Sequence, residues 1–116
     1  LYSQEFLSAT KLNHQAIRKS EDFMVDELFA CAVPIGAPIL KANFPRAYMD
    51  VNREPYELDP AMYHGKLPNF VNTSSVRVAS GLGTIARIVS DTEEIYREKM
   101  EVEDALIRVI TVGRVR

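Results

Sequence analysis

The side chains best suited to chemistry lie between residues 44 and 55, in the run FPRAYMDVNREP. Asn52 and Arg53 stand side by side there, Asp50 comes two positions before Asn52, and Arg46 comes seven before Arg53. A guanidinium offers a planar fork of donors that matches a carboxylate, and a neighbouring amide adds a donor and an acceptor. Asn52 and Arg53 therefore form a candidate carboxylate clamp, and Asp50 could hold one guanidinium in place.

The same run predicts a short strand over residues 47–51. Tyr48 and Val51 favour a pleated surface, while Pro45 and Pro55 cannot continue a ladder on either side. A straight strand rises about 3.3 Å per residue and would separate the two arginines by roughly 20 Å, so their convergence needs a bulge or a bent turn. The alternative is an exposed set of ion pairs, which composition alone favours because most surface charges are idle.

Two further segments are expected to frame this strand. The apolar run 37–42 predicts a second strand, and the three residues after it are few enough for an antiparallel pair. Residues 54–84 carry scattered prolines and glycines with little periodicity, which indicates one long irregular loop. Its aromatic residues give it apolar surface to pack, so we expect an ordered loop that covers a substrate.

A helix is predicted over residues 21–33. Ser20 is a good N-cap, Glu21 and Asp22 place negative charge in the first turn, and Gly36 is a natural terminator. Without further information the two acids are only cap charges.

The chain ends are predicted to be helical as well. Scattered apolar residues in 1–19 indicate two short helical turns packed on something outside this segment. Asp91 and Glu94 resemble a capping box and predict a helix over 92–109, whose apolar stripe would include Ile95 and Val109.

Composition narrows the classes of function. A chain of 116 residues with 47% hydrophobic content fits one small domain. The net charge of −2, from 14 basic and 16 acidic residues, argues against nucleic acid and anionic membranes as partners. The apolar run 28–40 is too short to span a bilayer. Cys31 is the only cysteine, and its apolar neighbours predict a buried thiol in a reducing compartment, which favours a cytoplasmic location.

Several motifs, in order along the chain, resemble the N-formylglutamate amidohydrolase family. They are SED at 20–22, VDELF at 25–29, GAP at 36–38, PRAYMDVNRE at 45–54, ELDPAM at 57–62 and GLGTI at 81–85. The run 50–53 also resembles the Asp-x-Asn-Arg element of the wider zinc carboxypeptidase and aspartoacylase group. The resemblance implies an α/β fold, the central part of a phosphorylase/hydrolase-like (zinc-carboxypeptidase-like) three-layer domain. Residues 1–116 would be a single partial domain truncated at both ends.

The resemblance also implies roles for particular residues. Asn52 and Arg53 would bind the substrate carboxylate, and Arg46 would stabilise the oxyanion that develops at the scissile carbonyl. Gly81 and Gly83 would form a loop near the substrate. The implied substrate is N-formyl-L-glutamate or another N-acyl amino acid, and the implied products are formate and glutamate.

The implied cofactor is zinc, with Asp22 as one ligand, although Glu21 stays open as the alternative. Two histidine ligands of the family lie in segments that have no match in this chain, while His14 and His64 are expected to be incidental. The alternative reading is an inactive fragment that only binds carboxylates or has a structural role. Core surface left open by missing strands would then favour homo-oligomers.

Overall fold

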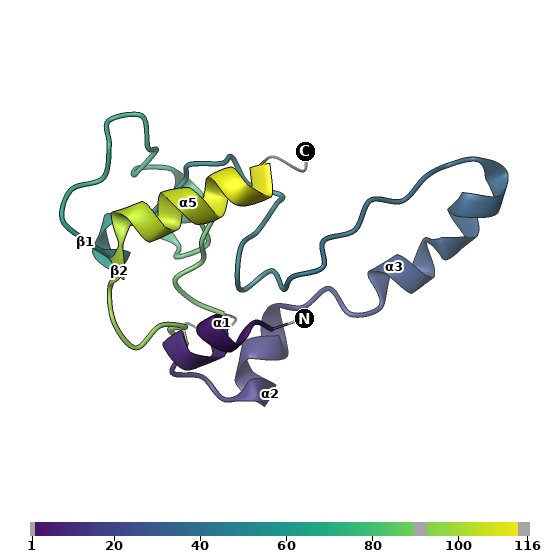
Figure 1. Cartoon of the computed structure of the whole chain (residues 1–116), viewed down its shortest axis with the longest axis horizontal. Helices are drawn as coiled ribbons and strands as arrows, with labels where there is room; N and C mark the ends of the chain where they lie inside the picture. The colour runs from purple at the N-terminus through teal and green to yellow at the C-terminus, as the bar shows by residue number, and fades with distance from the viewer. Residues whose placement is uncertain (1, 90–92, 114–116) are drawn as a thin grey trace.

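The computed structural model describes residues 2–89 and 93–113 and combines short helices with a small parallel sheet (Figure 1). The α-helices are α1 (Gln4–Ala9), α2 (His14–Ile17), α3 (Val25–Leu28), α4 (Val76–Ala79) and α5 (Val102–Gly113). The 3-10 helices are η1 (Arg18–Ser20), η2 (Ala30–Ile35) and η3 (Pro60–Met62). The strands β1 (Tyr63–His64) and β2 (Met100–Glu101) pair in parallel, with Tyr63 opposite Met100. The mixture agrees with the expected α/β class.

Two apolar clusters form the core of the body. In the first, α5 packs on the long loop, and its buried members are Met49, Leu58, Met62, Tyr63, Leu67, Val71, Ile85, Ala105 and Val109. In the second, the N-terminal helices pack on later segments, with Phe6, Ile17, Ala47, Ala86, Val89 and Ile95 as buried members. The two helical turns expected in residues 1–19 are confirmed, and they pack, as expected, on residues outside that segment.

Residues 47–51 do not form the predicted strand. The backbone turns instead, because the amides of Tyr48 and Met49 both donate to the Pro45 carbonyl, at 3.0 and 3.4 Å. Ala47 and Met49 are buried in different clusters, so tertiary packing overrides the local strand preference. The predicted strand at 37–42 is also wrong, since this segment runs exposed and without regular structure.

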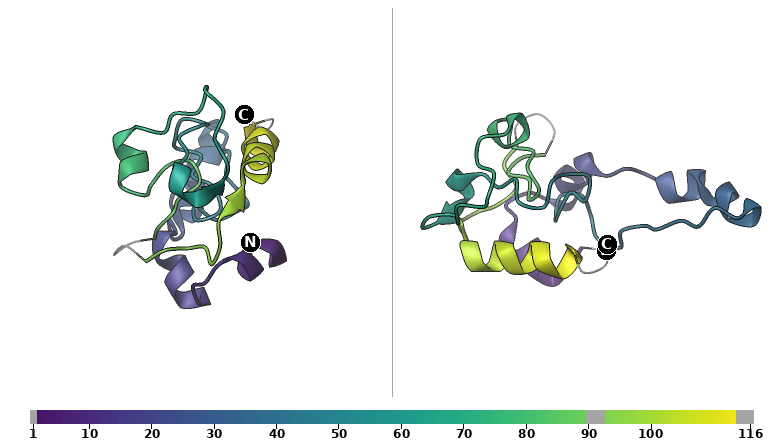
Figure 2. Two further views of the ribbon diagram at one scale, coloured as in Figure 1. Left: turned by 90° about the vertical axis from the view of Figure 1, so that its left-hand side faces the viewer. Right: turned by 90° about the horizontal axis from the view of Figure 1, so that it is seen from above.

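Residues 21–44 form a projecting hairpin, which we call the arm (Figures 1 and 2). The predicted helix over 21–33 is wrong in its extent: it is replaced by α3 and then η2, which ends at Gly36 with φ +93° as its sequence position indicated. The helix cannot start at Glu21, because that amide closes η1 on the Arg18 carbonyl and Met24 adopts φ +57°. Cys31 lies on this arm and is exposed, contrary to the prediction of a buried thiol.

The last helix begins later than predicted. Residues 93–99 are not helical, and α5 follows directly on β2. Ile95 is fully buried in extended backbone, where its amide donates to the Arg87 carbonyl at 2.9 Å and its carbonyl accepts from the Lys11 amide at 2.8 Å. Asp91 and Thr92, on which the predicted helix start depends, lie outside the described residues.

The segment 54–84 is ordered by its apolar side chains, as expected, but it is not wholly irregular, since it contains η3, β1 and α4. Leu58 and Tyr63 are buried, and Tyr56 packs edge-on against Phe70 with ring centroids 5.0 Å apart. Among the described residues, none of the helices has the length and apolar character that crossing a membrane requires.

Candidate active site

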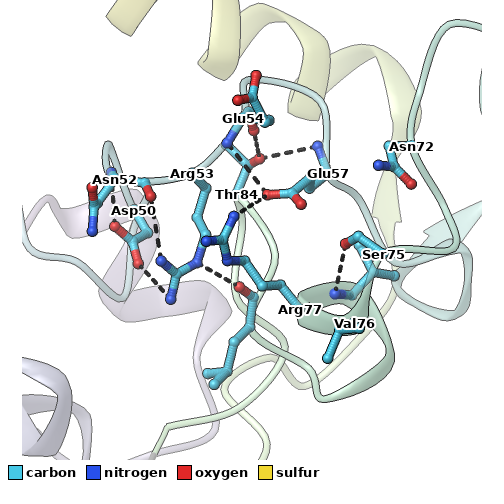
Figure 3. A network of polar contacts seen from close by, with 12 residues as sticks. Asp50, Asn52, Arg53, Glu54, Glu57, Asn72, Ser75, Val76, Arg77 and Thr84 are labelled. Atoms are coloured by element: carbon cyan, nitrogen blue, oxygen red, sulfur yellow. Dashed lines mark hydrogen bonds and ion pairs between the residues drawn. The ribbon is translucent and has the colours of Figure 1, made fainter.

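Asp50 is at the centre of a group of polar side chains on residues 46–53, which we call the turn (Figure 3). Its buried carboxylate lies 3.9 Å from Nε of Arg46 and 3.4 Å from a terminal nitrogen of Arg53, while its other oxygen accepts from the Asn52 amide at 2.9 Å. The Asp50 amide is itself bonded to the Thr84 carbonyl at 2.9 Å. The turn therefore brings both arginines to one carboxylate, which a straight strand could not do.

Arg53 is fixed by three contacts with the protein. Nε donates to the Leu82 carbonyl at 3.0 Å, one terminal nitrogen donates to the Asn52 carbonyl at 3.3 Å, and the other pairs with Asp50. Only 18% of the side chain is exposed. A guanidinium has five N–H donors, so two remain for an anion after these contacts are made. Such an anion would meet a guanidinium whose position is already set.

Arg46 connects the turn to the base of the arm. Its terminal nitrogen donates to the Asp22 carboxylate, and both side chains are about half exposed. The structure thus links Asp22, Arg46, Asp50 and Arg53 in one series of ion pairs. The two ends of the series, Asp22 and Arg53, are 31 positions apart in the sequence and are brought together at one place.

Glu21, the alternative metal ligand, is engaged elsewhere. The Tyr2 hydroxyl donates to one carboxylate oxygen at 2.6 Å and Nε of Arg18 to the other at 3.1 Å. The hydrogen bond from Tyr2, with a smaller effect of Arg18, lowers the pKa of Glu21 below its ordinary value, and burial raises the pKa of Tyr2. Asp22 is therefore the acid that faces Arg46.

A cleft of about 1040 Å³ lies between the arm and the turn. Its polar wall is formed by Asp22, Arg46, Asp50 and Asn52, and its apolar wall comes mainly from the arm, including Phe29. Arg53 is joined to the polar wall through its ion pair with Asp50. A small anion with an apolar part would find both kinds of surface here.

The two predicted substrate-binding glycines have a packing role in the structure. Gly81 has φ +80° and its amide donates to the Val78 carbonyl at 3.0 Å. A Cβ on Gly83 would lie 2.3 Å from the Glu57 carbonyl oxygen, so only glycine fits. A contact of either glycine with substrate stays a prediction.

Glu57 and Thr84 support the turn, and sequence reasoning did not select them (Figure 3). The buried Glu57 carboxylate lies 3.7 Å from Arg77 and accepts from the Glu54 amide at 3.3 Å. The Thr84 hydroxyl accepts from the Glu57 amide at 3.1 Å and donates to the Glu54 carbonyl. These bonds fix the chain directly after Arg53. The only signal was their place within the ELDPAM and GLGTI motifs.

The described residues do not fit a zinc site. No group of three or more His, Cys, Asp or Glu is placed to hold a metal ion within residues 2–89 and 93–113. Asp22 is a single carboxylate and is paired with a guanidinium, whose positive charge opposes a cation at the same oxygen. Asp22 alone therefore supplies at most one of the three protein ligands that a hydrolytic zinc requires.

Comparison with solved structures places this arrangement among the amidohydrolases. The chain is similar to the crystal structure of N-formylglutamate amidohydrolase from Ralstonia eutropha JMP134 at 2.00 Å resolution, with a TM-score of 0.84 and 29% sequence identity. The similarity covers 95% of this chain and 38% of that one, so the chain spans well under half the length of this relative.

The sequence comparison identifies the family. Residues 1–112 match the sequence model described as N-formylglutamate amidohydrolase (FGase). The chain therefore belongs to the N-formylglutamate amidohydrolase family, as its motifs predicted. No curated protein sequence matches it.

Proposed function

We propose that the protein takes part in hydrolysis of the amide bond of N-formyl-L-glutamate, releasing formate and glutamate, with the cleft beside the arm as the substrate site. The observation that carries this proposal is the series of ion pairs from Asp22 through Arg46 and Asp50, which line the cleft, to Arg53, which pairs with Asp50. The series contains two guanidinium groups, which suit an anionic amino-acid derivative. Three of its four residues lie in the motif at 45–54 that resembles the family.

In this proposal Asn52 and Arg53 bind a substrate carboxylate. The two N–H donors of Arg53 that the protein leaves unused, together with the Asn52 side chain in the cleft wall, supply the hydrogen bonds. Asp50 holds the guanidinium in place before substrate arrives, which reduces the entropy that binding would otherwise cost. Asp50 bonds the backbone amide of Asn52 and not its side chain, which lines the cleft.

Arg46 stabilises the negative charge that develops on the carbonyl oxygen in the transition state. Its side chain is 42% exposed and lines the cleft, so it reaches a bound ligand more readily than the enclosed Arg53. To act on substrate it must share or leave Asp22. Zinc remains a prediction of the resemblance with Asp22 as one ligand, and no step here runs through it.

The test is formate release from N-formyl-L-glutamate by Arg46→Ala and by a matched variant, Lys66→Ala. Both changes remove one cation, but Lys66 is an exposed residue of the long loop and does not line the cleft. Loss of an oxyanion donor lowers kcat by roughly a hundredfold or more, so Arg46→Ala should show that loss and Lys66→Ala should not. Wild-type turnover by Arg46→Ala would remove Arg46 from this role.

A second candidate is a chain that binds carboxylates or has a structural role without catalysis. It is favoured by the lack of a metal cluster among the described residues and by the 38% share of the solved relative that the chain spans. Zinc analysis and a formate assay on the 116-residue chain separate the two. An inactive, metal-free chain supports the second candidate, and calorimetric titration with N-formyl-L-glutamate then still tests the clamp. Titration with other N-acyl amino acids tests whether the formyl group is selected.

A further inference from the structure

Thr84 holds the backbone on both sides of Arg53. Its carbonyl accepts from the Asp50 amide at 2.9 Å, three residues before Arg53, and its hydroxyl donates to the carbonyl of Glu54, the residue directly after it. The Thr84 amide donates to the Glu57 carbonyl at 2.8 Å, and the hydroxyl also accepts from the Glu57 amide at 3.1 Å. Thr84 is fully buried, so the loss of its hydroxyl would leave buried backbone groups unpaired.

The segment that contains Thr84 also holds the guanidinium of Arg53 directly. The Leu82 carbonyl accepts from Nε of Arg53 at 3.0 Å. The Asp50 carboxylate lies 3.4 Å from a terminal nitrogen of the same guanidinium, and the Asp50 amide is the one bonded to Thr84. Two of the three protein contacts of the guanidinium therefore depend on residues 82–84.

Residues 81–84 have little capacity to bind a substrate themselves. The amides of Gly81, Leu82 and Thr84 already donate to backbone carbonyls of the protein, at 3.0, 2.8 and 2.8 Å. Within the described part of the chain, the residues that line the cleft do not include any of 81–84. The segment is therefore better placed to hold Arg53 than to contact a ligand in the cleft.

We propose that Thr84 is a positioning residue of the carboxylate clamp, and that residues 82–84 act on the substrate through the guanidinium of Arg53 instead of by contact. What the guanidinium binds rests on the proposed function, but its restraint by Thr84 does not. A guanidinium that is held in place before an anion arrives loses less freedom on binding. The hydroxyl of Thr84 thus contributes to affinity without touching the ligand.

The test compares two buried threonines in the 116-residue chain. Thr84→Val removes the hydroxyl and nearly keeps the size of the side chain, whereas Thr84→Ser keeps the hydroxyl. Thr10→Val is the matched control, because the buried Thr10 hydroxyl also bonds two backbone groups and lies at the end of α1. It donates to the Ile95 carbonyl at 2.5 Å and accepts from the Leu12 amide at 3.1 Å, and both partners lie outside the turn.

The first measurement is the exchange of the Arg53 Nε–H proton with water, followed by heteronuclear NMR and assigned by its loss in Arg53→Lys. This measurement needs no ligand. Exchange should be slow in the wild-type chain, in Thr84→Ser and in Thr10→Val, because Nε stays bonded to the Leu82 carbonyl. Exchange should be faster in Thr84→Val, by about tenfold, if one hydrogen bond's worth of restraint is lost.

The second measurement is the dissociation constant for N-formyl-L-glutamate by calorimetric titration. It should rise roughly tenfold in Thr84→Val and stay near the wild-type value in Thr84→Ser and Thr10→Val. Urea denaturation should show similar losses of stability in the two valine variants, because each loses the same kinds of hydrogen bond. A difference in affinity between them then reports on position and not on stability.

Two results would overturn the proposal. One is slow exchange and unchanged affinity in a folded Thr84→Val chain. The other is an equal change in Thr84→Val and Thr10→Val, which would make Thr84 a general contributor to stability. If Thr84→Val does not fold, the wild-type chain decides, since exchange of the Arg53 proton as fast as in free arginine would show that the guanidinium is not held. A wild-type chain that does not bind N-formyl-L-glutamate refutes the proposed function, and the exchange measurement still decides the role of Thr84.

Discussion

The arm and the body differ in how the same kinds of residue are used. In the body, Leu58 is fully buried and Gly83 lies against the Glu57 backbone. On the arm, Leu28 is 72% exposed and Gly36 has open space around it. The body thus stabilises itself, whereas the apolar residues of the arm add little until another surface reaches them. The turn proposed to bind substrate lies where the two regions meet, which explains why its polar groups contact both.

The largest contrast is expected from truncating one leucine in each region. Leu58→Ala leaves a cavity in the larger cluster and should lower the free energy of unfolding by about 2–5 kcal/mol. Leu28→Ala removes a side chain that the monomer leaves in water and should change it by less than about 0.5 kcal/mol. Urea denaturation at a concentration where the chain is monomeric measures both. Equal losses would mean that the arm packs on the body.

A smaller contrast is expected from adding one methyl group to a glycine in each region. Gly83→Ala forces the backbone away from Glu57 and should cost about 3 kcal/mol. Gly36→Ala meets no neighbour but must hold φ +93°, which costs about 1 kcal/mol. The same denaturation experiment compares them. If Gly36→Ala lowered the free energy of unfolding more than Gly83→Ala, the positive φ at Gly36 would be more costly to an alanine than the overlap with the Glu57 backbone.

The smallest effect should come from pH at the base of the arm. Folding lowers the pKa of Glu21 from its ordinary value of 4.5, so its contribution to stability is complete above that value and is lost as pH falls through the lower, folded pKa. Glu21→Gln should therefore flatten the decrease in stability on acidification below about pH 5. Urea midpoints measured from pH 6 to pH 3 test this. An unchanged slope would show that the contacts with Tyr2 and Arg18 do not persist in solution.

Sequence patterns correctly predicted the features that depend on residues close together in the chain. Gly36 ends a helical segment with positive φ, and the aromatic residues of the long loop do order it. The expectation that Asp50 holds a guanidinium matches its pairs with Arg46 and Arg53, and the family motifs predicted the family that the comparisons show. Each of these depends on residues close together in the chain or on a motif.

The failures came from contacts that are distant in sequence. Tyr48 favours a strand, but the Arg108 guanidinium lies 4.1 Å from its ring centroid and donates to its carbonyl at 3.1 Å, which helps hold it in a turn. Cys31 has apolar neighbours in the sequence, yet the element that carries them projects from the body. Burial and the supporting bonds of Glu57 and Thr84 are properties of the assembled chain, so no local pattern specifies them.

The guanidinium of Arg46, which pairs with Asp22, is involved in two competing interactions. It links Asp22 at the base of the arm to the turn, and under the proposed function it would also bind the incoming anion. Under the proposed function, an anion that draws the guanidinium away from Asp22 would loosen the base of the arm, and a ligand that holds the arm in place would oppose that movement. By thermodynamic reciprocity, each ligand then changes the affinity for the other by the same factor.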